Sequence, residues 1–380
     1  MEKMLSEVCD IQYGYAFDSA KFSADQGIPL IRIRDVVRGF SETYTTEVCD
    51  QEYIVNDGDI LIGMDGEFNI ARWKGGKAYL NQRVCRLLPK DEVDAMYLYY
   101  FMPKALKAIE DKTPFVTVKH LSAKELNKIV VTVPTIEDQK KIANCLQRLD
   151  ELISLRKQQL SKLDELVKSC FVEMFGDLAS PNCKWNTERL VDTCESSDDI
   201  KCGPFGTQLN KDEYMDSGVA VWEIPQINSL FLTMPTHFLT EEKAKQLDAY
   251  SIKPGDIAMS RKGNVGKCAV FPSILQAGII HSDVLRIRVD DSRVLPLFMM
   301  HQLHYSGAVQ HQIELVSSGA IMAGINVTKL KQIFIHIPPL NLQKQFVNFV
   351  EHIDKSKLEV QRSLEKLETL KKALMQKYFG

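Results

Sequence analysis

Two stretches of the chain place apolar residues at the alternating three- and four-residue steps of a coiled-coil heptad. The first runs from Pro134 to Gly176 and the second from Pro338 to Gly380. At 1.5 Å per residue, about 40 residues make a helix of roughly 60 Å. We expect these side chains to form the seam of a helix pair: Ile142, Leu146, Leu149, Ile153, Leu160, Leu163, Val167, Phe346, Val350, Ile353, Val360, Leu364, Leu367 and Leu374.

The second stretch repeats the first without a gap. A shift of 204 positions places Pro134 on Pro338 and Phe175–Gly176 on Phe379–Gly380. The same residue type also recurs 204 positions after each of Gln139, Lys140, Asn144, Asp150, Leu160, Lys162, Leu163, Leu166 and Lys168. An internal repeat indicates a duplicated structural unit. A single helix is too narrow to bury its apolar seam, so we expect the two copies to pack on each other.

The segment before the first long helix has the pattern of a mixed α/β domain. Pro29–Val36 alternates apolar with polar or basic residues, which predicts a half-exposed strand. Ile60–Ile62 is a short apolar run that follows a Gly-Asp turn, Asp94–Ile109 predicts a helix, and Asn127–Val133 predicts a strand closed by a proline.

The segment between the two long helices shows a diverged copy of that pattern. Lys253–Met259 matches Asn56–Ile62, and a glycine-containing loop follows each of them. Lys331–Pro338 repeats the strand that precedes the long helix. The expected fold class is therefore α+β, with two mixed α/β domains alternating with two long helices that pair as an antiparallel coiled coil, an internal pseudo-two-fold repeat. The expected boundaries are 1–133, 134–180 for the first helix and its connector, 181–337, and 338–380.

The composition of the chain argues against several classes of protein. No apolar run reaches the ~18 residues of a membrane span, and the acidic N-terminal segment Met1–Glu7 is unlike a signal peptide, which predicts a cytoplasmic location. The nine cysteines are an odd number without a Cys-x-x-Cys pair, so we expect reduced thiols and no metal site. The net charge of −3 allows local basic faces but not a uniformly basic surface.

Three motifs make the whole chain resemble the DNA-specificity (S) subunit of type I restriction–modification systems. The first is the doubled helix start of the form Ile/Val-x-Ile/Val-Pro-x-Ile/Leu-x-x-Gln, at Val131–Gln139 and Ile335–Gln343. The others are the Gly-Asp-Ile turn with its glycine-rich loop, and the Gly-Pro-Phe-Gly sequence that begins at Gly203. The family usually has Glu before the final Gln, whereas this chain has Asp138 and Leu342 at these positions.

The resemblance implies a non-catalytic subunit that recognises double-stranded DNA. Each globular domain would be a target-recognition domain for one half of a bipartite site, and the helices would set the half-site spacing and dock two methyltransferase subunits. Restriction motor subunits would join that complex. No cofactor is expected in this chain, while S-adenosylmethionine, ATP and Mg²⁺ are expected on the partner subunits.

Candidate DNA-contacting residues are the basic and amide side chains of the predicted loops and strands. Arg and Lys suit phosphates and guanine, and Asn and Gln suit adenine. The candidates are Arg32, Arg34, Arg72, Lys74, Lys77 and Arg83 in the first domain, and Gln208, Arg261, Lys262, Asn264 and Lys267 in the second. Each could equally be a solvated surface side chain. Trp73 and Trp222 are expected in the core rather than as stacking platforms.

Catalytic signatures are missing from the sequence. It has no phosphate-binding loop and no Gly-x-Gly-x-x-Gly, and Pro338-Pro339-Leu340 lacks the Asn/Asp-Pro-Pro-aromatic signature of amino-methyltransferases. His301, His304 and His311 are expected on a surface or interface helix rather than at a metal. Two alternatives stay open: a self-contained methyltransferase or nuclease with an unrecognised site, and a coiled-coil scaffold that binds only proteins. The exposed helix residues Lys140, Lys141, Arg148, Lys344 and Lys355 are candidate docking contacts for a partner, or else solvated faces of the helices.

Overall fold

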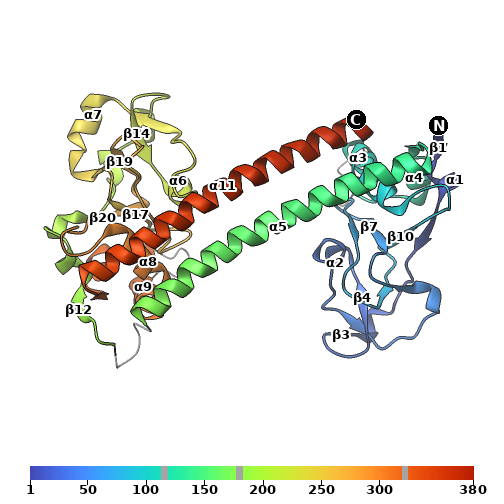
Figure 1. The fold of residues 1–380 in the computed structure, drawn as a ribbon, viewed down its shortest axis with the longest axis horizontal. Coiled ribbons are helices and arrows are strands. Elements are labelled where there is room, and N and C mark those ends of the chain that lie inside the picture. The colour runs from blue at the N-terminus through green and yellow to red at the C-terminus, as the bar shows by residue number, and fades with distance from the viewer. Residues whose placement is uncertain (113–118, 177–182, 319–323) are drawn as a thin grey trace. The chain divides into compact units, whose positions relative to one another are not determined.

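The computed structural model describes residues 1–112, 119–176, 183–318 and 324–380. The chain divides into two compact units (Figure 1). Unit 1 comprises Met1–Gln158 and Gln361–Gly380, and unit 2 comprises Gln159–Val360. No helix in the described part of the chain is long and apolar enough to cross a membrane.

Unit 1 contains two sheets that share one core. The first is antiparallel, in the order β2 (Cys9–Tyr13), β10 (Val84–Pro89), β7 (Ile60–Gly63), β8 (Ile70–Arg72). The second has the order β3 (Phe22–Ser23), β5 (Tyr44–Thr45), β4 (Ile28–Ile31), β9 (Ala78–Leu80), β6 (Ile54–Val55). Only the β4–β9 pair of this sheet is parallel. All four residues of β7 are buried, which explains why its sequence is a continuous apolar run.

Unit 2 repeats this arrangement. Its antiparallel sheet has the order β13 (Ile200–Cys202), β20 (Val284–Ile287), β17 (Ile257–Ser260), β18 (Cys268–Val270). Its second sheet has the order β15 (His237–Leu239), β14 (Val219–Trp222), β19 (Gly278–Ile280), β16 (Ser251–Ile252), with β14 and β19 parallel. The central strand β17 is fully buried, as β7 is in unit 1.

Shorter elements complete the units. In unit 1 these are β1 (Glu2–Met4) paired with β11 (Val130–Thr132), and helices α1 (Leu5–Val8), α2 (Ile33–Arg38), α3 (Ala95–Lys112) and α4 (Ala123–Asn127). In unit 2 they are β12 (Asn186–Arg189) paired with β23 (Phe334–Ile337), β21 (Ser317–Ser318) paired with β22 (Gly324–Ile325), and helices α6 (Ile224–Asn228), α7 (Glu241–Gln246), α8 (Pro296–Tyr305), α9 (Gly307–Val316) and α10 (Val327–Leu330). Single 3₁₀ turns lie at Ser19–Lys21, Gln51–Tyr53, Leu190–Thr193, Ser197–Asp199, Gly206–Gln208, Lys211–Glu213 and Asp248–Tyr250.

The two predicted long helices are present as α5 (Ile136–Phe175) and α11 (Leu340–Phe379). In unit 1, Leu146 and Leu149 of α5 share an apolar cluster with Phe379 of α11 and with Tyr97 and Tyr100 of α3. In unit 2, the end of α5 and the start of α11 meet in an aromatic cluster that contains Phe171, Phe175, Phe298 and Phe346. Within each unit, both long helices are thus packed into the core of the domain.

One predicted strand is wrong. Pro29–Val36 was expected to be extended throughout, but the strand ends at Ile31 and helix α2 begins at Ile33. The carboxylate of Asp35, which is buried, accepts a hydrogen bond from the backbone N–H of Arg32 at 2.9 Å and closes the first turn. Gly39 ends the helix in the left-handed conformation at φ 77°. The alternation of the side chains therefore reflected a strand end followed by one amphipathic turn.

The prediction that both Trp73 and Trp222 lie in the core is confirmed. Trp73 and Trp222 are 1 % and 2 % exposed, so neither is a free stacking platform. His301 and His304 lie on α8, where both are largely buried, and His311 lies on α9. No group of three or more metal-ligating side chains occurs among the described residues.

Candidate nucleic-acid interface

The loop that follows the central strand is held by the same backbone hydrogen bonds in both units. In unit 1 the N–H of Met64 donates to the carbonyl of Arg83 at 3.0 Å, and the N–H of Leu121 donates to that of Met64 at 2.7 Å. In unit 2, Arg261 takes the place of Met64: its N–H donates to the carbonyl of Asp283 at 2.8 Å. The N–H of Ile325 then donates to the carbonyl of Arg261 at 3.1 Å. Each loop is therefore fixed to the turn before the neighbouring strand and to a third segment from later in the chain.

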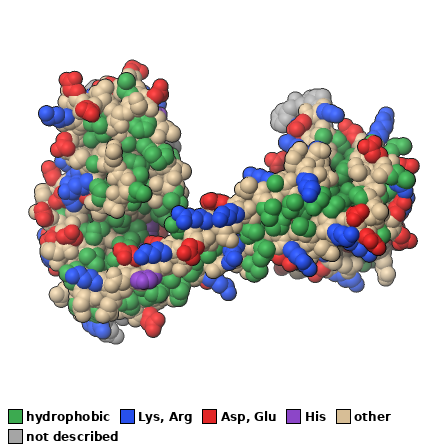
Figure 2. Space-filling model, turned by 45° about the horizontal axis from the view of Figure 1, so that its top comes forward, with side chains coloured by type: hydrophobic (Ala, Val, Ile, Leu, Met, Phe, Trp, Pro, Cys, Tyr) green, Lys and Arg blue, Asp and Glu red, His purple; other side chains and the backbone are tan. Residues whose placement is uncertain are grey.

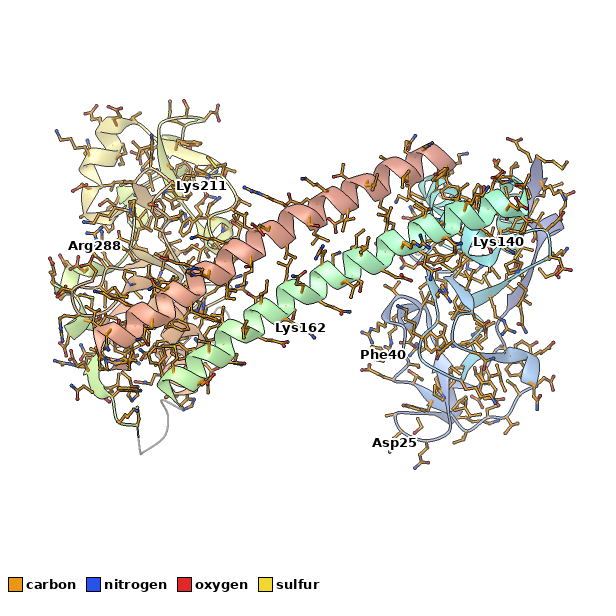
Figure 3. The ribbon with its side chains drawn as sticks, viewed as in Figure 1. Asp25, Phe40, Lys140, Lys162, Lys211 and Arg288 are labelled. Atoms are coloured by element: carbon orange, nitrogen blue, oxygen red, sulfur yellow. The ribbon has the colours of Figure 1, made fainter. Side chains whose placement is uncertain are left out.

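A buried or partly buried aspartate sets the turn before each central strand. Asp59 accepts hydrogen bonds from the N–H of Asn56 and from Arg86, both at 2.9 Å. Asp256 is 1 % exposed and accepts two bonds from Arg288, at 2.7 and 2.8 Å. This bidentate pair raises the pKa of Arg288 (Figure 3 labels the residue). The Gly-Asp-Ile motif is thus a structural clamp that positions the strand and its loop.

The candidate residues of unit 1 fall into two groups. Arg32, Arg72, Lys74 and Lys77 are exposed and form no ion pair with any residue that the structure describes. Arg34 and Arg83 are held by neighbours: Arg34 lies 3.6 Å from Asp35, and Arg83 lies 3.5 Å from Asp65.

A groove of about 650 Å³ brings part of the first group together. It is lined by Arg38, Arg72 and Lys74 on one side and by α3 and α5 on the other. The helix side carries Asp150 and Glu151, so the basic groups of the groove face acidic ones. The structure places Arg72 and Lys74 in this groove and leaves Arg83 outside it, in the turn before β10.

Four of the five candidates of unit 2, Arg261, Lys262, Asn264 and Lys267, lie in one loop. Arg261 donates through Nε to the carbonyl of Ile325 at 3.2 Å, and its guanidinium lies 4.9 Å from the centroid of the Phe205 ring. The Nζ of Lys262 lies 2.7 Å from the carboxylate of Asp283. Asn264 is exposed at the tip of the loop.

Two further candidates are engaged in hydrogen bonds: Lys267 at the end of this loop, and Gln208 in the 3₁₀ turn Gly206–Gln208. Lys267 donates through Nζ to the carbonyl of Asn228 at 3.0 Å, which ties the loop to the end of α6. Gln208 accepts a hydrogen bond from the hydroxyl of Tyr250 at 2.9 Å and remains exposed. Both keep part of their polar surface open to solvent.

Sequence reasoning missed the acidic and imidazole partners in these loops. Asp65 lies 2.6 Å from Nδ1 of His120, and Asp283 also has His281 at 3.8 Å. The predicted DNA contacts are all basic or amide side chains, although aspartate can also accept a hydrogen bond from the amino group of cytosine. On the face shown in Figure 2, Lys and Arg are interspersed with Asp and Glu, so affinity for DNA has to arise from local groups.

The predicted seam residues are all at least half-buried. Buried members are Leu146, Leu149, Val167, Phe346, Val350, Val360 and Leu364, and half-buried members are Ile142, Ile153, Leu160, Leu163, Ile353, Leu367 and Leu374. The predicted docking residues Lys140, Lys141, Arg148, Lys344 and Lys355 are exposed, and Figure 3 shows Lys140 near the start of α5.

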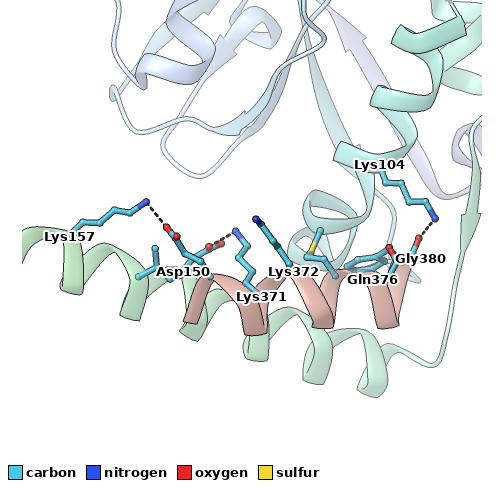
Figure 4. A pocket seen from close by; sticks show the side chains of 11 residues that line it. Lys104, Asp150, Lys157, Lys371, Lys372, Gln376 and Gly380 are labelled. Atoms are coloured by element: carbon cyan, nitrogen blue, oxygen red, sulfur yellow. Dashed lines mark hydrogen bonds and ion pairs between the residues drawn. The ribbon is translucent and has the colours of Figure 1, made fainter. Parts of the chain in front are cut away.

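Ion pairs join the two long helices within unit 1 (Figure 4). Lys371 lies 2.5 Å from Asp150, and Lys157 lies 3.2 Å from Glu368. Lys104 of α3 donates to the carbonyl of Phe379 at 2.6 Å, and this end of α11 lines a pocket of about 820 Å³ with α3 and α5. Within unit 2, Lys357 lies 2.6 Å from Asp164. In both units, higher residue numbers on α5 meet lower ones on α11.

Comparison with known proteins decides the family. The family model described as the type I restriction modification DNA specificity domain matches residues 1–165 and again residues 182–370. The chain belongs to this family. Its function is accordingly DNA sequence recognition, and the resemblance drawn from the sequence motifs is confirmed.

Relatives of this specificity subunit match it over nearly its whole length. The EcoBI specificity subunit of Escherichia coli is 25% identical over 99% of this chain and 84% of its own length. The MjaVIII specificity subunit of Methanocaldococcus jannaschii is 22% identical over 91% of this chain and 87% of its own length. The solved structure of the S subunit from M. genitalium superposes with a TM-score of 0.64 at 14% identity, covering 100% of this chain and 96% of that one, which shows a shared fold.

Specificity subunits are non-catalytic and bind no cofactor themselves. The prediction that this chain is not an enzyme is therefore confirmed by its family. The alternative of a self-contained methyltransferase or nuclease is set aside on the same ground.

Proposed function

We propose that the chain reads a bipartite double-stranded DNA site, with one target-recognition domain for each half. The domains would be residues 1–133 and 181–337. They would be joined by residues 134–180, a long helix with its connector, and by the long helix of residues 338–380. The observation that carries this proposal is the duplicated loop frame, in which Met64, Arg83 and Leu121 correspond to Arg261, Asp283 and Ile325. The two frames share their backbone bonds but differ in their side chains, as expected of two readers of different sequences.

The long helices would act as an antiparallel coiled coil that sets the distance between the half-sites. Their length of 40 residues each corresponds to about 60 Å, and half-sites one helical turn apart are separated by about 34 Å. Support comes from the ion pairs within each unit and from the burial of the seam residues. The repeat in sequence makes the two helices a pseudo-two-fold pair.

Two methyltransferase subunits would dock on the exposed faces of these helices, and restriction subunits would join them. S-adenosylmethionine, ATP and Mg²⁺ would be bound by those partners. The exposed lysines and arginine at 140, 141, 148, 344 and 355 lie on faces that are not occupied by the packing within each unit. This subunit would then supply sequence recognition and the partners would supply the chemistry.

The proposal is tested by long-read mapping of methylated bases in the host, with and without the gene. We expect one split motif to disappear with the gene and to return with the wild-type chain. Alanine at Arg261, Lys262 and Asn264 should then alter only one half of the motif. The assignment of one domain to each half-site would be overturned if deletion of the gene removed no motif from the host. It would also be overturned if the alanine substitutions changed both halves of the motif equally.

A further inference from the structure

A partly exposed ion pair occupies the same place in both units with its charges exchanged. In unit 1 the acid is Asp65, in the loop after the central strand, and the base is Arg83, in the turn before β10. In unit 2 the loop carries the base, Lys262, and the turn before β20 carries the acid, Asp283. The backbone bonds described above place residue 65 opposite residue 262 in this correspondence, and residue 83 opposite residue 283.

Folding does not account for this exchange. The side chains of Arg83 and Asp65 are 53% and 21% exposed, and those of Lys262 and Asp283 are 39% and 26% exposed. In each pair the basic side chain is exposed, whereas the acidic one is mostly buried, and Oδ1 of Asp283 is itself buried. A pair that water reaches on its basic side contributes little to stability, because that charge is already solvated. The backbone that carries them is the same in both units and is fixed by its own hydrogen bonds, so either arrangement of charges would fit it.

A basic side chain next to an acidic one can form hydrogen bonds with the major-groove edge of one G·C base pair. In the major groove, guanine presents the two acceptors N7 and O6, and cytosine presents an amino donor beside them. Arginine or lysine can donate to guanine while aspartate accepts from cytosine. If the basic and the acidic side chain exchange places on one backbone frame, the frame fits the same G·C pair in the opposite orientation.

We propose that these two ion pairs determine specificity for one G·C base pair in each half-site. Arg83 and Lys262 read guanine, and Asp65 and Asp283 read the amino group of the paired cytosine. The G·C pair is inverted between the two domains relative to the shared frame. Arg261 and Asn264, on the same loop as Lys262, lie next to this contact and read or position the adjoining nucleotides. This inference rests on the proposed function and adds the identity of a base pair to it.

The test is a specificity switch in the full complex with its methyltransferase partners. In the double variant Asp65→Lys with Arg83→Asp, we expect one G·C pair of the first half-site to become C·G in the mapped methylation motif, with the second half unchanged. The variant Lys262→Asp with Asp283→Arg should do the same in the second half only. The matched control is Lys107→Asp with Asp111→Lys, an exposed pair at 3.2 Å on α3, which should leave the motif unchanged.

In vitro, binding is measured to duplexes that carry each of the four base pairs at every position of the half-sites. The switched complexes should prefer the inverted pair by roughly 5- to 150-fold at one position, the range expected for one bidentate base contact. The single variant Lys262→Met should reduce discrimination at that same position, while Lys262→Arg should retain it. A wild-type preference that persists in every variant, or a change at an A·T pair, would overturn the inference. A different result would contradict the proposed function itself, namely that the wild-type complex shows no split motif.

Discussion

Gln139 and Gln343 make the same three hydrogen bonds in the two units. Both side chains are fully buried one turn into the long helices α5 and α11. Gln139 accepts from the N–H of Asp94 at 2.9 Å and donates to the carbonyls of Glu92 at 3.1 Å and Pro134 at 3.0 Å. This amide therefore joins the start of the long helix to the start of α3.

Gln343 repeats the arrangement in unit 2. It accepts from the N–H of Leu295 at 2.9 Å and donates to the carbonyls of Arg293 at 3.1 Å and Pro338 at 2.8 Å. The unusual Leu342 before this glutamine leaves those bonds intact. The departure from the family motif that the sequence shows at this position is thus a change outside the buried clamp.

Replacing Gln343 with leucine should destabilise unit 2 by about 1–3 kcal/mol, since it leaves the Leu295 N–H and two carbonyls without their buried partner. The measurement is urea unfolding followed by tryptophan fluorescence. Gln158→Leu is the matched control, because that glutamine is exposed on α5 and should change stability by less than about 0.5 kcal/mol. Equal effects of the two substitutions would contradict the clamp.

Exchanging the charges of Asp150 and Lys371 should restore what each single substitution loses. Both side chains are about one-third exposed, so we expect a coupling free energy of only about 0.5–1 kcal/mol from a double-mutant cycle. Asp150 also accepts a hydrogen bond from Tyr100 at 2.8 Å. Burial raises the pKa of this tyrosine, and the hydrogen bond to Asp150 raises it further. The coupling to Lys371 should therefore be measured with Tyr100→Phe as the background. Strictly additive effects would show that the pair does not join the helices.

Unit 2 should lose stability as the pH falls below about 6.5. Burial lowers the pKa of His301 from 6.5 to about 3, with smaller effects from His304 and Lys357, and neither ring nitrogen has a hydrogen-bond partner among the described residues. The folded state therefore favours the neutral ring, and below pH 6.5 the unfolded chain binds the proton first. The contribution is fully present above the unfolded pKa and decreases by about 1.4 kcal/mol per pH unit below it, until the folded pKa is reached.

The check is the free energy of unfolding between pH 7 and pH 5. His301→Leu should flatten the pH dependence, and His311→Leu, at an exposed position, should not. His304, whose pKa burial also lowers, remains in both variants and leaves some residual slope. An unchanged slope in His301→Leu would mean that the ring is protonated, or absent from the core, in the folded protein.

Lengthening the helices should change the spacing of the DNA half-sites. Four residues added after Gln158 and four after Val360 extend each helix by about 6 Å, close to the rise of two base pairs. We expect the mapped motif to gain one or two base pairs between its halves while both halves keep their sequence. A motif with its original gap would argue against the helices as the spacer.

Removing exposed charge from the groove of unit 1 should weaken DNA binding through phosphate contacts. Arg72→Ala with Lys74→Ala should lower the slope of log affinity against log salt concentration by about 2, without changing the motif. Lys128→Ala is the control, since this exposed lysine lies after α4 and outside the groove. A changed motif would instead place these residues on base edges.

The sequence alone determined the long helices and the duplication. Helical periodicity depends on residues three and four apart, so the heptads located α5 and α11 within a few residues, and the repeat followed from direct comparison. The sequence pattern gave a wrong prediction at Pro29–Val36. Alternation of apolar and polar residues does not reveal the hydrogen bond from the Arg32 N–H to Asp35 that starts α2.

Only the tertiary structure could show which side chains meet in the loops. Asp65 and Arg83, and Lys262 and Asp283, come from different segments that strand pairing brings together. Their exchanged charges appear only when the two backbone frames are aligned through their hydrogen bonds. Local patterns fix elements because they depend on near neighbours in sequence, whereas a recognition surface depends on strand pairing between distant residues.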